Sequence, residues 1–114
     1  MELDGTSWTL VSGVPVPHDM TVPRPTAAFA DGRIFGTSGC NRYTGGYTFD
    51  DGSFTLGVLA TTRMACPPPA DEIERSFLAA LERVTGARLH DAELVLELDD
   101  DAEPLVFEPA GEEV

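Results

Sequence analysis

Two cysteines and a small group of polar residues are the positions of this 114-residue chain whose types and spacing suggest chemistry. Cys40 and Cys66 are its only cysteines. A thiolate becomes reactive when a nearby positive charge lowers its pKa, and Arg42 and Arg63 are close enough in sequence to serve. A guanidinium cannot act as a base, however. We therefore favour a structural pair, either disulfide-bonded or packed as two small apolar groups, over a reactive or redox-switching one.

A polar cluster is expected at the same end of the chain's central hairpin. Asn41 and Arg42 follow a glycine turn, and Thr61, Thr62 and Arg63 fall across the predicted ladder. The cluster has two interpretations. Its amide and hydroxyl groups can satisfy backbone groups of the turn and bond across strands, or its arginines can donate to an anionic or polar ligand. We favour the structural interpretation and keep the binding site as the alternative.

Other catalytic patterns are missing from the sequence. His18 and His90 belong to no cluster with ligand spacing, and the segment GTSGCN does not precede a helix as a phosphate-binding loop would. The acidic run at 99–103 lacks the alternating ligands of a calcium loop, and two cysteines match no zinc pattern. We expect no catalytic residue, no metal site and no cofactor.

The hairpin that positions both candidate sites turns at Asp51-Gly52. This dipeptide favours a two-residue type I′ turn. The resulting register pairs Phe49 with Phe54, Tyr47 with Leu56, Gly45 with Val58 and Tyr43 with Ala60. Every large apolar residue then shares one face, as a half-buried ribbon requires. Continued further, the ladder sets Cys40 opposite Arg63, which is three residues before Cys66. We therefore predict that the sulfurs of Cys40 and Cys66 are neighbours.

The remaining pattern predicts one domain over residues 1–114. Strands are expected at residues 7–11, 87–90, 94–98 and 104–108, with a second Asp-Gly hairpin over 26–35, and the proline-rich residues 13–25 form a loop. A single amphipathic helix is expected over 71–85, with Asp71 and Glu74 as a capping box and Gly86 after its end. The fold class is mostly β (α+β): a curved antiparallel meander or half-barrel of about seven or eight short strands with one helix packed on it.

Charge and hydropathy limit the partners. The net charge is −13, which argues against binding nucleic acid or anionic membrane surfaces. The sequence holds no apolar run of transmembrane length, and its N-terminus has no basic or apolar export signal. We expect a monomer that is cytoplasmic, or that is located in the cell envelope or secreted if an export signal was trimmed.

The chain resembles the META/HslJ domain family over nearly its whole length. The resemblance is carried by residues 5–10 (GTSWTL), 36–43 (GTSGCNRY) with Gly45 and Tyr47, and 59–66 (LATTRMAC). It implies a small, mostly β domain with one packed helix, of a kind found in envelope lipoproteins and secreted proteins and linked to heat shock and stress, novobiocin resistance, and motility and virulence of protozoan parasites. It carries no catalytic residues.

We therefore expect a non-enzymatic accessory or binding domain whose partner is an unknown protein or small molecule. The alternatives are a thiol-dependent redox protein using Cys40 and Cys66, and a domain that binds a small lipid-like molecule. A chain of this size has little apolar surface to spare for an open cavity. We expect its inward side chains to form a filled core, with Tyr47, Phe49, Phe54, Leu56, Phe77 and Leu81 among them.

Overall fold

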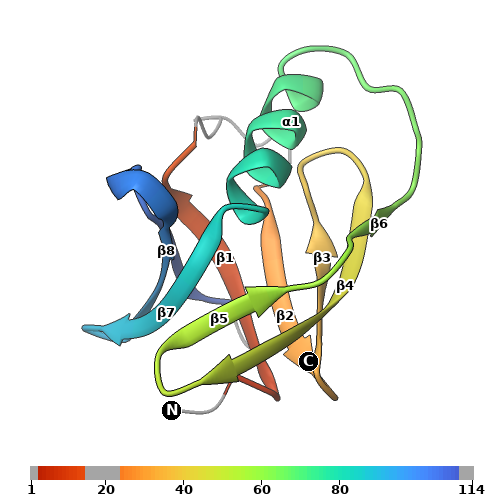
Figure 1. Cartoon of the computed structure of the whole chain (residues 1–114). Helices are drawn as coiled ribbons and strands as arrows, with labels where there is room; N and C mark the ends of the chain where they lie inside the picture. Colours follow the sequence, from red (N-terminus) through yellow and green to blue (C-terminus); the bar gives the residue numbers. More distant parts are fainter. Residues whose placement is uncertain (1–2, 15–23, 111–114) are drawn as a thin grey trace.

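A computed structural model of the chain, which describes residues 3–14 and 24–110, shows a closed antiparallel β-barrel with one helix (Figure 1). The barrel strands follow the order β3-β2-β1-β9-β8-β7-β5-β4, and β4 pairs back onto β3. The short strand β6 adds to the free part of β4. The bounds are β1 Thr6–Ser12, β2 Thr26–Ala30, β3 Arg33–Thr37, β4 Arg42–Asp50, β5 Ser53–Leu56, β6 Ala60–Thr61, α1 Ala70–Leu81, β7 Val84–His90, β8 Glu93–Leu98 and β9 Leu105–Pro109.

The barrel closes through β4, which is the longest strand and has two different neighbours on its two halves. Its first half pairs with β3, from Thr37↔Arg42 to Arg33↔Gly46. Its second half pairs with β5, from Tyr47↔Leu56 to Asp50↔Ser53. The predicted half-barrel is therefore the coarser description. Hairpin patterns alone do not show that β3 and β4, which are joined by a turn containing Cys40, complete a ring.

Both Asp-Gly turns form as predicted. Asp51 and Gly52 have φ values of 54° and 87°, and Asp31 and Gly32 have φ values of 54° and 75°. These positive angles are those of a type I′ turn. The registers Phe49↔Phe54 and Tyr47↔Leu56 are confirmed. The hairpin expected over residues 26–35 is confirmed as well, with Phe29 paired to Ile34.

The predicted register is wrong beyond Leu56, where it shifts by one residue. Thr44 pairs with Ala60 and Tyr43 with Thr61, because Val58 and Leu59 form a bulge opposite Gly45, whereas Gly57 still donates its backbone N–H to the O of Gly46 at 2.9 Å. Gly45 leaves room for this bulge, since a Cβ there would lie 2.8 Å from the Cδ2 of Leu59. As a result Val58 is 93% exposed, although the sequence placed it on the core face.

The helix is shorter than predicted. It spans Ala70–Leu81, with Glu82 as its C-cap. Val84 already begins β7 and pairs with Leu98. The pairing of β7 with β8 thus outweighs the helical pattern of the last turn. The expected capping box is also wrong, because Pro69 occupies the N-cap and makes no side-chain cap bond.

The core fills the barrel and the space beneath α1, which lies over the upper part of the barrel in Figure 1. The helix contributes Ile73, Phe77 and Leu81, all buried. The ring of Phe77 packs edge-on to those of Tyr43 and Phe107, with centroid separations of 5.7 and 6.3 Å. Of the six residues expected in the core, Phe54, Phe77 and Leu81 are buried and Tyr47, Phe49 and Leu56 are half-buried against it. His18 and residues 15–23 of the proline-rich loop lie outside the described residues.

Candidate functional site

Asn41, in the turn between β3 and β4, is buried and uses every polar atom of its side chain. Its Oδ1 accepts hydrogen bonds from the Oγ1 of Thr62, at 2.9 Å, and the backbone N of Met64, at 2.6 Å. Its Nδ2 donates to the backbone O of Met64 and to the Oε2 of Glu74, both at 3.1 Å. A fully satisfied buried amide fixes its surroundings and has no bonding capacity left for a ligand.

The carboxylate of Glu74 joins α1 to this turn. Its Oε1 accepts a hydrogen bond from the backbone N of Asn41 at 2.9 Å and another from the Oγ of Ser38, which is buried. Burial opposes ionisation of Glu74, but the hydrogen bonds from Ser38 and Asn41 outweigh it and lower the pKa of the carboxyl. Glu74 therefore acts as an ionised anchor of the turn.

Cys40 and Cys66 lie at disulfide distance beside this network, with their Cα atoms 6.1 Å apart. The prediction that the sulfurs are neighbours is confirmed. The bulge changes the details, because the Sγ of Cys40 lies 3.5 Å from the backbone O of Met64 and Cys40 does not lie opposite Arg63. The pair links the turn before β4 to the segment that leads into α1. This is the position of a structural cross-link.

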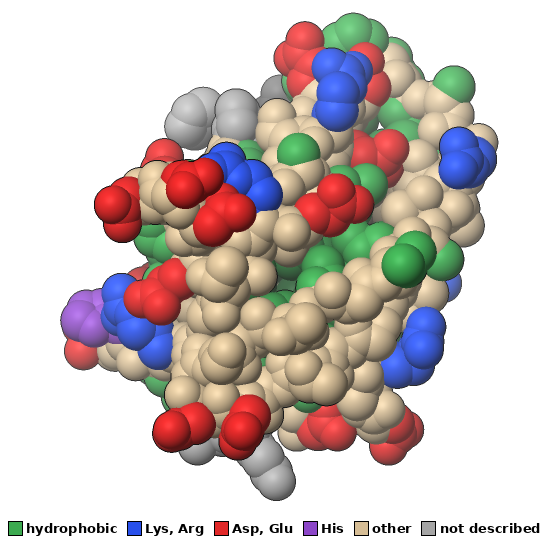
Figure 2. Space-filling view, viewed as in Figure 1, with side chains coloured by type: hydrophobic (Ala, Val, Ile, Leu, Met, Phe, Trp, Pro, Cys, Tyr) green, Lys and Arg blue, Asp and Glu red, His purple; other side chains and the backbone are tan. Residues whose placement is uncertain are grey.

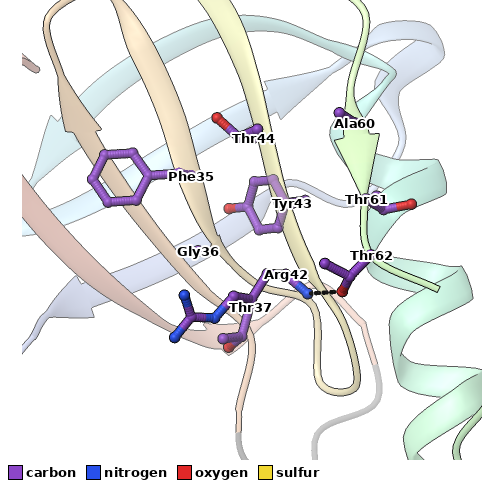
Figure 3. Close-up of a pocket in the computed structure, with 9 residues that line it drawn as sticks. All are labelled: Phe35, Gly36, Thr37, Arg42, Tyr43, Thr44, Ala60, Thr61 and Thr62. Carbon is purple, nitrogen blue, oxygen red and sulfur yellow. Dashed lines mark hydrogen bonds between the residues drawn. The ribbon is translucent and has the colours of Figure 1, made fainter. Parts of the chain in front are cut away.

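A groove of about 580 Å³ lies on the face formed by β3, β4 and β6 (Figure 3). Its lining comprises Phe35, Gly36 and Thr37 from β3, Arg42, Tyr43 and Thr44 from β4, and Ala60, Thr61 and Thr62 from β6 and the residue after it. The volume falls within the range of ordinary ligand sites. The ring of Phe35 is 42% exposed, so the groove offers an aromatic surface together with threonine hydroxyls and one guanidinium.

Strand pairing fixes the positions of the groove side chains. Phe35 pairs with Thr44, and Thr44 pairs with Ala60, so these three lie in one row across the sheet. Thr37 and Arg42 form the next row, in which the backbone N of Arg42 donates to the Oγ1 of Thr62 at 3.0 Å. Figure 3 shows the Arg42 guanidinium extending beside Thr37.

Tyr43 lines the groove but belongs mainly to the core. Its side chain is 2% exposed, and its hydroxyl donates to the backbone O of Thr26 at 2.6 Å. Burial raises the pKa of the Tyr43 hydroxyl far above its ordinary value. Tyr43 therefore stays neutral and is not a candidate acid or base near neutral pH.

A second, smaller cleft of about 390 Å³ opens where the bulge passes the end of α1. It is lined by Leu56, Gly57, Val58, Leu59 and Glu82. β5 and β7 pair only at Ser53↔Gly86, beside the Asp51-Gly52 turn, so the two strands are unpaired where the cleft opens and the barrel wall is thin at this point. Figure 2 shows a hollow between α1 and β5 with hydrophobic side chains at its bottom.

The structure divides the predicted polar cluster into two parts. Asn41 is buried in the turn network, and Thr62 serves both that network and the rim of the groove. Arg42 and Thr61 line the groove, whereas Arg63 is exposed and is not part of the lining. Sequence reasoning missed Phe35, although the adjacent apolar pair Ile34-Phe35 was a usable signal, because consecutive strand residues face opposite sides.

Two features are absent from the residues that the structure describes. None of the helices there is long and apolar enough to cross a membrane. Within the same residues, no three His, Cys, Asp or Glu side chains are grouped so that they could hold a metal ion.

Comparison with known proteins gives a family and two related structures. The family model of the META domain matches residues 1–112. A solved structure described as the NMR structure of the protein from Burkholderia xenovorans is 34% identical, with a TM-score of 0.78 over 96% of this chain and 85% of that one. Another, described as the NMR structure of the protein, is 27% identical, with a TM-score of 0.70 over 93% and 90% of the two chains. No curated protein matches.

Proposed function

Because this chain belongs to the META domain family, we propose that it is a non-enzymatic binding domain that uses the groove on β3, β4 and β6 to engage its partner. The observation that carries the proposal is the row of Phe35, Thr44 and Ala60 beside Arg42. An exposed aromatic ring in a groove with a few directed polar groups is the usual composition of a recognition site. None of the groove residues supplies a nucleophile paired with a base.

The groove favours ligands that combine an apolar group with a carboxylate or another anion. Phe35 provides the apolar contact, and the guanidinium of Arg42 provides paired donors in a fork that matches a carboxylate. The hydroxyls of Thr37 and Thr44 add neutral donors and acceptors. No carboxylate lines the groove, so a cationic ligand has no opposite charge to pair with among the lining residues.

A screen of small molecules tests this proposal directly. Fragments that carry an aromatic or aliphatic ring, each with a carboxylate, an amide or an amine, are added to the ¹⁵N-labelled domain, and amide shifts are recorded. We expect the carboxylate series to shift the amides of Phe35, Thr37, Arg42, Thr44 and Thr61. Phe35→Ala should reduce the affinity, because it removes the ring that forms the apolar contact.

Leu89→Ala is the matched control, since Leu89 is 50% exposed on β7, outside the groove lining. It should leave fragment binding unchanged. Hits that shift none of the groove amides, or that bind Phe35→Ala as well as the parent protein, would contradict the proposal.

The smaller cleft supports a second candidate, the binding of a small lipid-like molecule. Its apolar lining by Leu56, Val58 and Leu59 at a thin part of the barrel wall is the observation in favour. The same screen separates the two functions. Uncharged apolar fragments that shift Leu56–Leu59 and Glu82 rather than the groove would favour this second site.

A further inference from the structure

Strand β6 is the end of the sheet and leaves one edge open. In the part of the chain that the structure describes, β6 pairs with β4 alone. Thr62 donates its backbone N–H to the O of Arg42 at 3.0 Å. Since bonded and non-bonded pairs alternate along an antiparallel ladder, the N–H and C=O of Thr61 point away from β4. An edge of this kind is a template for one more strand.

Exposed apolar side chains gather around this edge. Among the described residues, four large hydrophobic side chains are exposed: Phe35, Val58, Met64 and Leu89. Val58 and Met64 flank β6 in the sequence and are 93% and 63% exposed, and Phe35 lies across Thr44 from Ala60. Three of the four thus surround β6. Such a concentration indicates a contact surface rather than scattered surface residues.

The arginines show the same distribution. Arg75, Arg83 and Arg88 each form an ion pair with an aspartate or glutamate. No ion pair in the described part of the chain involves Arg33 on β3, Arg42 on β4 or Arg63 after β6. In Figure 2 the right-hand margin, along β6 and the segment that follows it, shows arginine and hydrophobic side chains, whereas acidic side chains dominate the opposite side.

We propose that the open edge of β6 binds an extended segment of a partner protein as an additional strand, and that this segment carries apolar residues together with one or two carboxylates. The proposal rests on the proposed function and specifies its ligand. Backbone hydrogen bonds to Thr61 supply the affinity common to any strand, and side chains supply the selectivity. The carboxylates meet Arg63 and the long side chain of Arg42, and the apolar residues meet Val58 and Met64.

The charge of the domain explains why the carboxylates are few and why the occupant is not a second copy of the chain. A net charge of −13 repels another copy and any strongly acidic segment. Salt at physiological strength screens that repulsion beyond about 8 Å. One or two carboxylates placed directly at the arginines are therefore attracted locally.

Peptide titration tests the proposal. Terminally blocked seven-residue peptides carry glutamate, glutamine or lysine at one odd-numbered and one even-numbered position, so that each face of the added strand presents one of them, and valine at the remaining positions. Each series is titrated into the ¹⁵N-labelled domain. We expect the glutamate series to bind several-fold more tightly than the glutamine series and the lysine series to bind least, with shifts at the amides of residues 58–64. Arg42→Ala and Arg63→Ala should each weaken the glutamate peptide about threefold to fivefold, as expected for an exposed ion pair.

Backbone methylation of the peptide identifies strand addition. A strand bonds to its neighbour through every second residue. N-methylation of the peptide residues that bond to β6 should therefore abolish binding, and N-methylation of the residues between them should leave binding unchanged. Arg88→Ala, which removes an arginine already paired with Glu97 on the far part of the sheet, should not change the affinity.

The outcomes separate this inference from the proposed function. Equal binding of both methylated registers, together with groove shifts, would overturn strand addition while the groove remains a binding site. Tighter binding of the lysine series, or no binding by any series, would also overturn it. So would sedimentation that shows dimers of the domain that Thr61→Pro abolishes. If, in addition, no fragment shifts the groove amides, the proposed function fails as well.

Discussion

The carboxylate of Glu74 accepts hydrogen bonds from both the backbone amide and the side-chain amide of Asn41, which is 33 positions earlier in the chain, at 2.9 and 3.1 Å. One contact thus fixes the helix to the turn before β4. The cysteine pair ties the same turn to the segment before the helix. The two links act together to hold the loop that starts at β6.

The Glu74 contact makes stability depend on acid. Hydrogen bonding lowers the pKa of this carboxyl in the folded state below its ordinary 4.5. Its stabilisation is therefore fully present above the unfolded-state pKa and is lost as the pH falls through the folded-state pKa. We expect the melting temperature to decrease as the pH is lowered below about 4.5. In Glu74→Gln this decrease should be smaller, because the variant has no carboxyl at this position to protonate.

At pH 7, Glu74→Gln should lower the free energy of unfolding by about 1–3 kcal/mol, because a glutamine NH₂ would face the donors of Asn41. Glu72→Gln, at an exposed position of the same helix, is the matched control and should cost much less. Both substitutions are measured by urea titration at pH 7. Equal effects of the two on the free energy of unfolding would show that the Glu74 contact does not contribute to stability.

Tyr43 should resist alkaline titration. Burial raises the pKa of its hydroxyl in the folded state, so its stabilising contribution is present below the unfolded-state pKa of about 10 and is lost as the pH rises above it. We expect part of the phenolate absorbance of the protein to appear only when alkali unfolds it. Tyr43→Phe should remove that part and shift alkaline unfolding to higher pH. Phenolate absorbance from Tyr43 before the loss of the circular dichroism signal would contradict this assignment.

The cysteine pair should stabilise the domain only when it is oxidised. Cross-linking Cys40 to Cys66 removes unfolded-state entropy equivalent to roughly 3–4 kcal/mol. Cys40→Ser should therefore lower the melting temperature strongly under oxidising conditions and little in a reductant. Cys66→Ser and the double variant should match it. If Cys40→Ser costs the same in both conditions, the cysteine contributes packing alone.

Ala92 should be replaceable by glycine with a gain in stability. It occupies the turn between β7 and β8 with a φ of 68°, where the two other two-residue turns have glycine. A side chain in this left-handed region costs about 1 kcal/mol. We expect Ala92→Gly to raise the free energy of unfolding by about 0.5–1 kcal/mol in thermal or urea unfolding.

Ala79→Gly, at an exposed position within α1, provides the opposite control and should destabilise by about 1 kcal/mol. A loss of stability in Ala92→Gly would mean that the alanine methyl contributes contacts that outweigh the backbone strain.

The predictable parts of the fold are those with short-range causes. Each Asp-Gly dipeptide specifies its own turn, so the registers at Phe49↔Phe54 and Phe29↔Ile34 follow from neighbouring residues. The bulge at 58–59 was not predictable, because it depends on the absence of a side chain at Gly45 on another strand. The end of α1 at Leu81 was missed for a similar reason: Val84 fits both a helical stripe and a strand, and pairing with Leu98 decides between them.

The candidate site was predictable only in its structural half. Asn41 has the turn role that its sequence position suggests, but its helix partner, Glu74, has no local signal for this contact, because its sequence position is typical of a helix cap. The groove depends on three strands that meet only when the barrel closes. Phe35 and Arg42 therefore become neighbours of Ala60 and Thr62 through tertiary pairing, which a single sequence does not reveal.

The pairing of β1 with β9 determines when the domain can fold during its synthesis. Trp8 pairs with Pro109, and Leu10 pairs with Phe107, so the strand made first completes its sheet with the strand made last. Leu105 and Phe107 are fully buried in the common core. A growing chain that has not reached residue 109 leaves one side of β1 unpaired and the core open. Closure of the barrel therefore requires synthesis through β9, and a chain interrupted before residue 109 would expose the unpaired edge of β1 to aggregation.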